Sequence, residues 1–286
     1  MRAKIISFIN LKGGVAKTTT TVGTAIALAE HFKKRVLVID MDPQTNATIM
    51  LIGDEKWKEL DDAGHTLYSL FQEKLIKKRK GSFSLPETIQ KNIGNLKNVA
   101  GLDLFPSSLR LIKIQDHLAD IERKSDFGKR SWEVLRDVVS AIVDEYDYIL
   151  IDCPPNMGIL TQNALFISDY YIIPCIPDIL STYGIPEMHS EVEEFEGTWE
   201  KEVICLGIVI TKFKRNSPLH KRRIEELEEE TVRLFRTKFP ENTKFAEAAE
   251  FRETMTFRQK WGYQKQADLF YDFAKEIMER IEEYGD

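Results

Sequence analysis

Residues 4–19 read KIISFINLKGGVAKTT, and this stretch decides the fold. It contains the apolar run Ile5–Ile9, which predicts a buried strand, and an Ala- and Leu-rich helical pattern follows over Thr19–Phe32. A glycine-containing turn between a strand and a helix presents backbone N–H groups and the positive end of the helix. The stretch therefore predicts a loop that holds phosphate groups.

Two side chains give this loop its expected chemistry. The ammonium of Lys17 would reach the β- and γ-phosphates of a nucleotide, and the hydroxyl of Thr18 would bind Mg²⁺, as in ordinary phosphate loops. The ordinary pattern G-x-x-x-x-G-K-[ST] is not met, because Leu11 and Ala16 stand where its two glycines should be. A tight strand-to-helix turn with exposed lysines is the alternative.

Apolar runs without polar alternation recur along the chain and alternate with helical patterns, as is typical of a parallel sheet buried on both faces. The strand candidates are Val36–Ile39, Tyr148–Ile151, Tyr170–Ile176 and Val203–Ile210, and the helix candidates include Trp132–Glu145 and Asp268–Tyr284. We expect an α/β fold with a doubly wound, mostly parallel sheet and helices on both faces. It would form a single domain, 1–286, with a helical and loop excursion at about 53–101.

The composition excludes several classes of protein. Apolar residues make up 43% and charged residues 30% of the chain, which fits a globular protein and neither a disordered nor a fibrous one. Cys153, Cys175 and Cys205 are widely spaced in apolar runs and predict buried thiols in a reducing compartment. The start of the chain lacks the pattern of a secretory signal, and no window approaches 18 consecutive apolar residues. We expect a cytoplasmic protein.

Two further strand candidates end in carboxylates. Residues 36–48 read VLVIDMDPQTNAT, so Asp40 and Asp42 come at the end of a strand, where they can position water and magnesium. An ordinary Asp-x-Asp-Pro turn is the alternative. Residues 146–155 read YDYILIDCPP, and Asp152 there could reach Mg²⁺ directly or through water.

These three segments, in this order, resemble the motifs of the ParA/MinD family of deviant Walker A P-loop ATPases, over about Lys4–Ile281. The D-x-P-P continuation after Asp152 is more similar to ParA proteins than to MinD. The resemblance implies a Mg²⁺-dependent ATPase with weak intrinsic turnover. It also implies that Lys12, the additional lysine of the loop, crosses a dimer interface to the partner's nucleotide, so that two ATP molecules are sandwiched between two subunits.

The resemblance carries over a set of site residues. Asp42 would orient the attacking water, with Asp40 in support, and the catalytic set would also contain Lys12 and Lys17. Mg²⁺ would be bound by Thr18, Asp152 and Asp42. Glu241 departs from the family, in which many relatives have Arg after the proline. The nucleotide would be bound by Lys12, Gly13, Gly14, Val15, Ala16, Lys17, Thr18, Thr19, Thr211, Lys212, Pro240 and Asn242.

The function implied is that of a switch. ATP would close the homodimer, the dimer would bind DNA without sequence preference, and a ParB-like or cargo-adaptor protein would trigger hydrolysis to segregate or position a plasmid, chromosome or protein cargo. The ATP state would be associated with the nucleoid. The net charge is −6, but residues 212–265 carry 14 Lys or Arg against 9 Glu, or +5. The DNA candidates there are Lys214, Arg215, Lys221, Arg222, Arg223, Lys244 and Arg252.

Other functions fit the sequence less well. A MinD-like membrane ATPase needs a basic amphipathic C-terminal helix, whereas this chain ends in Glu279, Glu282 and Glu283, so no membrane partner is expected. An ATP-dependent ligase of dethiobiotin synthetase type is disfavoured by the segment at Asp42 and by Lys12. An iron–sulfur relative needs paired cysteines, which the spacing does not offer. Because the first strand begins at Lys4, we expect no preceding DNA-reading domain and no site-specific repression.

Overall fold

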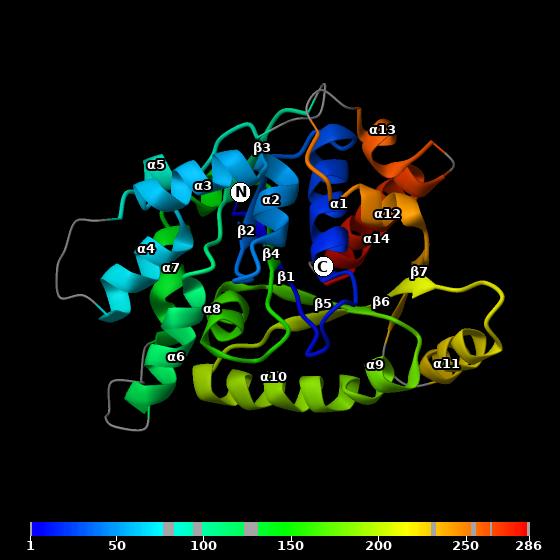
Figure 1. Cartoon of the computed structure of the whole chain (residues 1–286). Coiled ribbons are helices and arrows are strands. Elements are labelled where there is room, and N and C mark those ends of the chain that lie inside the picture. Colours follow the sequence, from blue (N-terminus) through cyan, green and yellow to red (C-terminus); the bar gives the residue numbers. More distant parts are fainter. Residues whose placement is uncertain are drawn as a thin grey trace.

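The computed structural model describes residues 2–76, 83–93, 99–122, 131–229, 233–252, 256–263 and 265–284. Seven strands form one sheet in the order β3-β2-β4-β1-β5-β6-β7, and all neighbouring strands are parallel (Figure 1). The α/β prediction is therefore confirmed. The strands are β1 (Lys4–Phe8), β2 (Val36–Asp40), β3 (Leu102–Phe105), β4 (Tyr148–Asp152), β5 (Tyr170–Cys175), β6 (Ile204–Phe213) and β7 (Leu234–Pro240).

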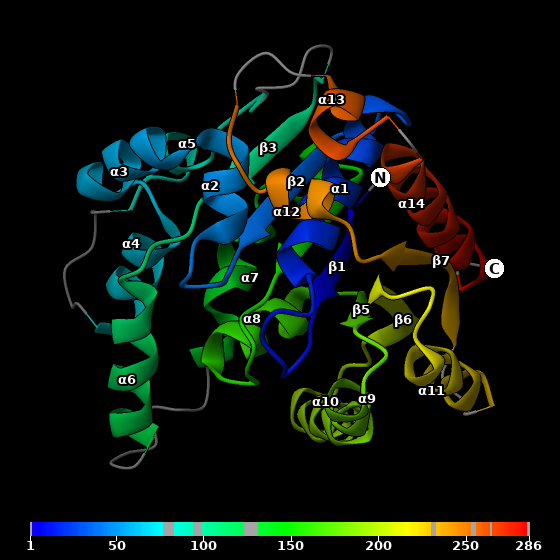
Figure 2. The same cartoon turned by 45° about the vertical axis from the view of Figure 1, so that its right-hand side comes forward.

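Helices cover both faces of the sheet, as Figures 1 and 2 show. One face packs against α1 (Lys17–Glu30), α2 (Asn46–Ile52), α12 (Thr243–Glu247), α13 (Phe257–Trp261) and α14 (Gln266–Glu283). The other packs against α4 (Leu67–Phe71), α6 (Leu111–Glu122), α7 (Val134–Val139), α8 (Ile159–Ile167), α10 (Ile185–Trp199) and α11 (Pro218–Glu229). Shorter elements are α3 (Asp54–Ala63), η1 (Gln72–Ile76), α5 (Leu85–Thr88), η3 (Val143–Glu145) and α9 (Ile179–Tyr183).

The region at about 53–101 is helical where it is described, through α3, α4, η1 and α5. Residues 77–82 and 94–98 of this excursion lie outside the described residues. The prediction of one continuous helix over Trp132–Glu145 is wrong, because α7 ends at Val139 and a turn precedes η3. The turn allows Ile142 and Tyr146 to be buried in the same core before the chain enters β4.

The last helix, α14, buries Phe270, Phe273 and Ile277 as its spacing predicts. A Cβ atom on Gly23 of α1 would come within 2.2 Å of the Phe270 ring, so the glycine permits the close packing of these two helices. The acidic side chains of α14 do not all face water, because Glu276 is buried. Its carboxylate accepts hydrogen bonds from the backbone of β7 and from the Arg280 guanidinium.

The centre of the sheet brings the three predicted strand ends together. The chain moves outward from β1 to β2 on one side and from β4 to β5 on the other, so the strand order reverses at the β1–β4 pair. In register, Asp152 lies beside Phe8 of β1 and beside Asp40 of β2. Open α/β sheets bind ligands in the crevice outside the carboxyl ends of the strands at such a point. The fold thus places the site at the loop that follows β1.

Candidate functional site

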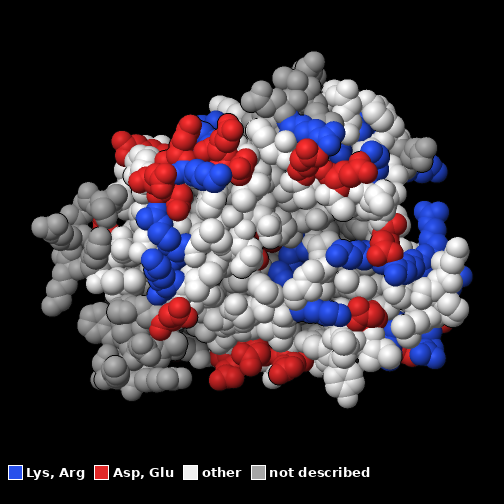
Figure 3. Space-filling model, in the orientation of Figure 1, with Lys and Arg blue, Asp and Glu red and all other residues white. Residues whose placement is uncertain are grey.

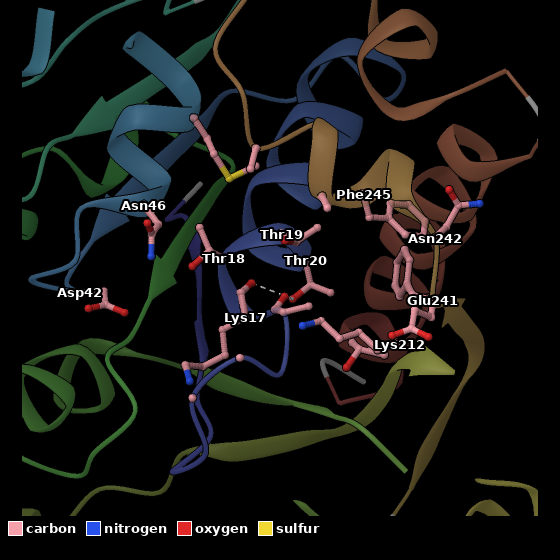
Figure 4. A pocket seen from close by; sticks show the side chains of 18 of the residues that line it. Lys17, Thr18, Thr19, Thr20, Asp42, Asn46, Lys212, Glu241, Asn242 and Phe245 are labelled. Atoms are coloured by element: carbon pink, nitrogen blue, oxygen red, sulfur yellow. Dashed lines mark hydrogen bonds between the residues drawn. The ribbon is translucent and has the colours of Figure 1, made fainter. Parts of the chain in front are cut away.

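A cavity of about 710 Å³ opens at this crevice. Its loop end is made by Gly13, Gly14, Lys17, Thr18 and Asp42, and its β7 end is made by Lys212, Pro240, Asn242 and Phe245. Figure 4 shows Lys17, Thr18 and Asp42 at one end and Lys212, Asn242 and Phe245 at the other. Of the predicted nucleotide-binding residues, those that line the cavity are Gly13, Gly14, Ala16, Lys17, Thr18, Thr19, Thr211, Lys212, Pro240 and Asn242.

The loop after β1 is held by its backbone. Ala16 precedes α1 in the left-handed region, with φ 65° and ψ 29°. This conformation costs a non-glycine residue roughly 1–2 kcal/mol, which explains why glycine would suit the position. Val15 is buried, and its carbonyl accepts a hydrogen bond of 2.9 Å from the Thr211 hydroxyl of β6. The Val15 side chain therefore fills the core instead of lining the cavity, and Thr211 anchors the loop.

Lys17 is buried at the loop, with 6% of its surface exposed. Its ammonium donates hydrogen bonds to the carbonyls of Asn10 and Lys12, at 3.0 and 3.1 Å. Burial lowers the pKa of Lys17, while the carboxylates of Asp152 and Asp42 favour its charged form. The ammonium is thus fixed between the loop carbonyls and the acidic strand ends, where a bound phosphate would meet it.

The two acidic residues after β2 have different surroundings. Asp40 is fully buried and accepts hydrogen bonds from the N–H and hydroxyl of Thr48, at 2.8 and 2.6 Å, and from the N–H of Asp42. Burial and the neighbouring Asp152 raise the pKa of Asp40 well above its usual value. Asp40 therefore fixes the segment that follows β2 through these hydrogen bonds, whereas Asp42 lines the cavity. Burial also raises the pKa of Asp42, against the lowering effects of the Gln44 N–H and of Lys17.

Asp152 has no exposed surface, and neither of its carboxylate oxygens has a hydrogen-bond partner with good geometry within the described residues. Burial raises the pKa of Asp152, the nearby Thr18 hydroxyl lowers it, and the Asp42 carboxylate raises it further. A buried carboxylate without partners calls for an explanation, and a cation or its bound water would supply one.

The surroundings of Asp152 suit magnesium. In the described part of the chain no three His, Cys, Asp or Glu residues form a group that could hold a metal by themselves. Mg²⁺ does not need such a cage, because it keeps several waters and binds one or two protein groups together with substrate phosphates. The predicted set of Thr18, Asp152 and Asp42 fits this mode of binding.

The β7 end combines apolar side chains such as Phe245 with the polar side chains of Lys212, Glu241 and Asn242. Phe239 and Pro240 end strand β7, and α12 begins at Thr243. Asn242 is the N-cap of α12, since its side chain accepts a hydrogen bond from the Lys244 N–H. Sequence reasoning missed the lining residues of α2, of α12 and the turn after it, and of α14, which are Asn46, Ile49, Met50, Thr243, Phe245, Ala246, Ala249 and Phe270. Their one signal is ordinary helical periodicity.

Lys12 does not line the cavity in this structure. Its ammonium donates hydrogen bonds to both carboxylate oxygens of Asp178, each at 3.1 Å, and to the Ser181 hydroxyl at 2.8 Å. Asp178 also caps α9 by accepting a hydrogen bond from the Ser181 N–H. Within α9, Leu180 and Tyr183 expose 76% and 84% of their surface, the largest fractions among the big apolar side chains of the described residues.

Most of the DNA candidates are paired with acidic side chains. Five of the seven form ion pairs, and in the face seen in Figure 3 basic and acidic groups lie beside one another. Arg215 and Lys221 have no ion-pair partner within the residues that the structure describes. The five pairs are Lys214–Glu241, Arg222–Glu226, Arg223–Glu226, Lys244–Glu247 and Arg252–Glu250.

Two other expectations can be checked directly. All three cysteines are free of disulfide bonds, with Cys153 and Cys175 buried and Cys205 half-buried. Among the described residues, no helix combines the length and the apolar character needed to cross a membrane.

Comparison with known proteins gives three informative matches. A family model described as an AAA domain matches residues 3–204. The sporulation initiation inhibitor protein Soj of Bacillus subtilis is 29% identical over 96% of this chain and 98% of its own length. The chromosome partitioning protein ParA of Myxococcus xanthus is 30% identical over 78% of this chain and 70% of its own.

The fold also occurs in a solved enzyme. Cobyrinic acid a,c-diamide synthase from Mycobacterium smegmatis, with a bound ATP analogue and magnesium, superposes with a TM-score of 0.74. The match covers 98% of this chain and 96% of that one at 19% identity, which shows a common fold and not a common function.

Proposed function

The chain belongs to the ParA/MinD family of deviant Walker A P-loop ATPases, and we propose that it is a ParA-type ATPase that binds Mg²⁺ and ATP, pairs with a second copy and hydrolyses the nucleotide. The observation that carries the proposal is the buried, unpartnered carboxylate of Asp152 beside Thr18 and Lys17. A carboxylate in that state is best explained by a cation that arrives with the nucleotide.

The residues at the loop end would have different roles in phosphoryl transfer. The loop N–H groups and the Lys17 ammonium would bind the phosphates, and Thr18 and Asp152 would hold the magnesium, which neutralises charge on the phosphates when it is bound. Asp42 lines the same end of the cavity and would orient the attacking water and accept its proton. Burial raises the pKa of Asp42, which makes its carboxylate a better proton acceptor.

Dimerisation is supported by the surface around Lys12. We infer that Lys12 reaches the nucleotide of a second copy, as in the family that the chain resembles. The exposed Leu180 and Tyr183 lie on α9, the helix whose cap Asp178 contacts Lys12. Apolar side chains that are this exposed next to a functional lysine would be covered when a second copy binds.

The wider cellular role follows from the relatives. We propose that the ATP dimer binds DNA weakly and without sequence preference through Arg215 and Lys221, and that a ParB-like or cargo-adaptor protein stimulates hydrolysis. The Myxococcus relative is a chromosome partitioning protein, which supports a chromosome as the cargo among the plasmid, chromosome and protein alternatives, and with it a cytoplasmic, nucleoid-associated location. Because the other basic side chains are paired with Glu, few phosphates would be neutralised, so the affinity for DNA should be low and its decrease with salt should be shallow.

A single-turnover assay tests the hydrolysis. With protein in excess over labelled ATP and Mg²⁺, the Asp42→Ala variant should bind ATP and release little phosphate, because it lacks the group that orients water. Asp147→Asn is the matched control, since Asp147 pairs with Arg35 at the surface, and it should react at the wild-type rate. Turnover by Asp42→Ala at the wild-type rate would refute the role of Asp42.

A further inference from the structure

We propose that Asp178 and Ser181 hold Lys12 in the free subunit and compete for it with the partner subunit, so that this contact sets how readily the dimer forms. The inference rests on the proposed ATP-dependent dimer. It adds a restraint to that dimer, carried by residues that lie outside the nucleotide cavity.

The contact uses the whole hydrogen-bonding capacity of the lysine. An ammonium group has three N–H donors. The Lys12 ammonium lies 3.1 Å from Oδ1 and 3.1 Å from Oδ2 of Asp178, and 2.8 Å from Oγ of Ser181. No donor is left for a phosphate of another subunit. Lys12 must therefore leave Asp178 before it can contact a partner's nucleotide.

The backbone at this point is fixed, so the change concerns the Lys12 side chain. The Lys12 N–H donates a hydrogen bond of 2.8 Å to the side-chain oxygen of Asn10. The side-chain amide of Asn10 in turn donates to the carbonyl of Pro174 in β5, also at 2.8 Å. This buried link ties the loop to the strand that leads into α9. Lys12 can then exchange partners by rotating its side chain, while the loop keeps its shape for the phosphates.

The strength of the contact suits a reversible restraint. The Lys12 and Asp178 side chains are 35% and 30% exposed, and water at such a site screens an ion pair. The triphosphate of ATP offers more negative charge than one carboxylate, so it can take over the lysine. A symmetric dimer breaks two such contacts, one in each subunit, and the effect on the dimerisation constant is therefore squared.

The variant Asp178→Asn removes the negative charge that pairs with Lys12 but keeps a side chain that can cap α9. Asparagine caps helices as well as aspartate does, so the amide oxygen can still accept the Ser181 N–H while the ion pair with Lys12 is lost. We would measure the dimer dissociation constant by sedimentation with Mg²⁺ and ATP, in the Asp42→Ala background that prevents turnover. The dimer should be about tenfold tighter at low salt, from about threefold in each subunit.

Two further variants sharpen the test. Ser181→Ala removes one of the three hydrogen bonds to Lys12 and should tighten the dimer by a smaller factor. Asp268→Asn is the control, because it breaks the Arg258–Asp268 pair, which has a similar exposure but lies between α13 and α14, and it should leave the dimer unchanged. In the nucleotide-free protein, Asp178→Asn should also speed the reductive methylation of Lys12, a readout that does not depend on the dimer.

The outcomes are distinguishable. A tighter Asp178→Asn dimer together with faster methylation supports the inference. A dimer of equal or lower stability overturns the inference alone, because it would mean that Asp178 is neutral or presents Lys12 to the partner. If neither the parent protein nor the variant dimerises with ATP, the proposed function fails, and the restraint falls with it.

Discussion

The two ends of the cavity are built from different kinds of interaction. At the loop end, backbone hydrogen bonds fix the buried ionisable groups of Lys17 and Asp42, and Asp152 is fixed by its place at the end of central strand β4. At the β7 end, Phe245 and its neighbours offer apolar surface on short elements near the edge of the sheet. Ionic contacts in a buried site are individually strong, whereas apolar contacts add small increments. Changes at the loop end should therefore cause large losses of nucleotide affinity, and changes at the β7 end should cause small ones.

The largest effect is expected for Lys17→Ala. Two phosphate contacts from a charged donor are worth about 1.5–3 kcal/mol each, so the affinity for Mg²⁺ and ATP should fall by at least about 100-fold. Isothermal titration calorimetry measures this loss. Lys58→Ala, which changes an exposed lysine on α3, should bind as the wild type does. Similar affinities for the two variants would mean that the loop end does not control binding.

The second expectation is that the free energy of unfolding decreases as the pH rises, because of the buried carboxylates at the loop end. Burial raises the pKa of Asp152 to about 7, so the folded chain keeps a proton that the unfolded chain loses near pH 4. The stabilisation is complete below about pH 4 and is lost as the pH rises toward 7. Denaturant unfolding of the nucleotide-free protein should show a decrease in the free energy of unfolding on the order of 4 kcal/mol over this range, from about three pKa units.

Asp152→Asn tests the origin of that slope. The variant cannot ionise, so its stability should change less between pH 5 and pH 7.5 than that of the wild type. Some slope should remain, because the pKa values of Asp40 and Asp42 are also raised. A slope identical to that of the wild type would assign the pH dependence to groups elsewhere in the molecule.

The smallest effect is expected at the β7 end. Phe245→Ala removes apolar surface from the cavity and should weaken ATP binding by about tenfold, which corresponds to about 1.4 kcal/mol. Phe245→Leu keeps most of that surface and should bind nearly as the wild type does. A loss for Phe245→Ala as large as that for Lys17→Ala would remove the distinction between the two ends.

The difference between the polar loop end and the largely apolar β7 end also explains how much of the site could be predicted from the sequence. Lys17 and Thr18 adjoin one another in the sequence, and Asp42 and Asp152 end apolar runs, so residue type and position identified the loop end. Met50 and Ala249 add apolar surface to the cavity wall, and they look like any other apolar residue until the fold brings α2 and α12 over α1. The contact between Lys12 and Asp178 spans 166 residues and depends on the position of α9, which no local pattern gives.

Some strands of the fold could likewise be predicted from the sequence, and others could not. The five strands with long buried runs were predicted to within a few residues. Strand β3 has only four residues, and β7 alternates buried Phe235, Thr237 and Phe239 with more exposed positions, as an edge strand does. Both escaped a search for continuous apolar runs. The burial of Glu276 could not be predicted from the sequence, because the β7 backbone that its carboxylate contacts becomes a neighbour only in the folded chain.

We propose that ATP, and not ADP, joins two copies of this chain through Lys12. Sedimentation velocity of the Asp42→Ala protein with Mg²⁺ and either nucleotide tests it most directly. We expect a dimer with ATP and a monomer with ADP, and a monomer with either nucleotide when Lys12→Ala is added. The same sedimentation coefficient with ATP and ADP, or an unchanged dimer after Lys12→Ala, would contradict it.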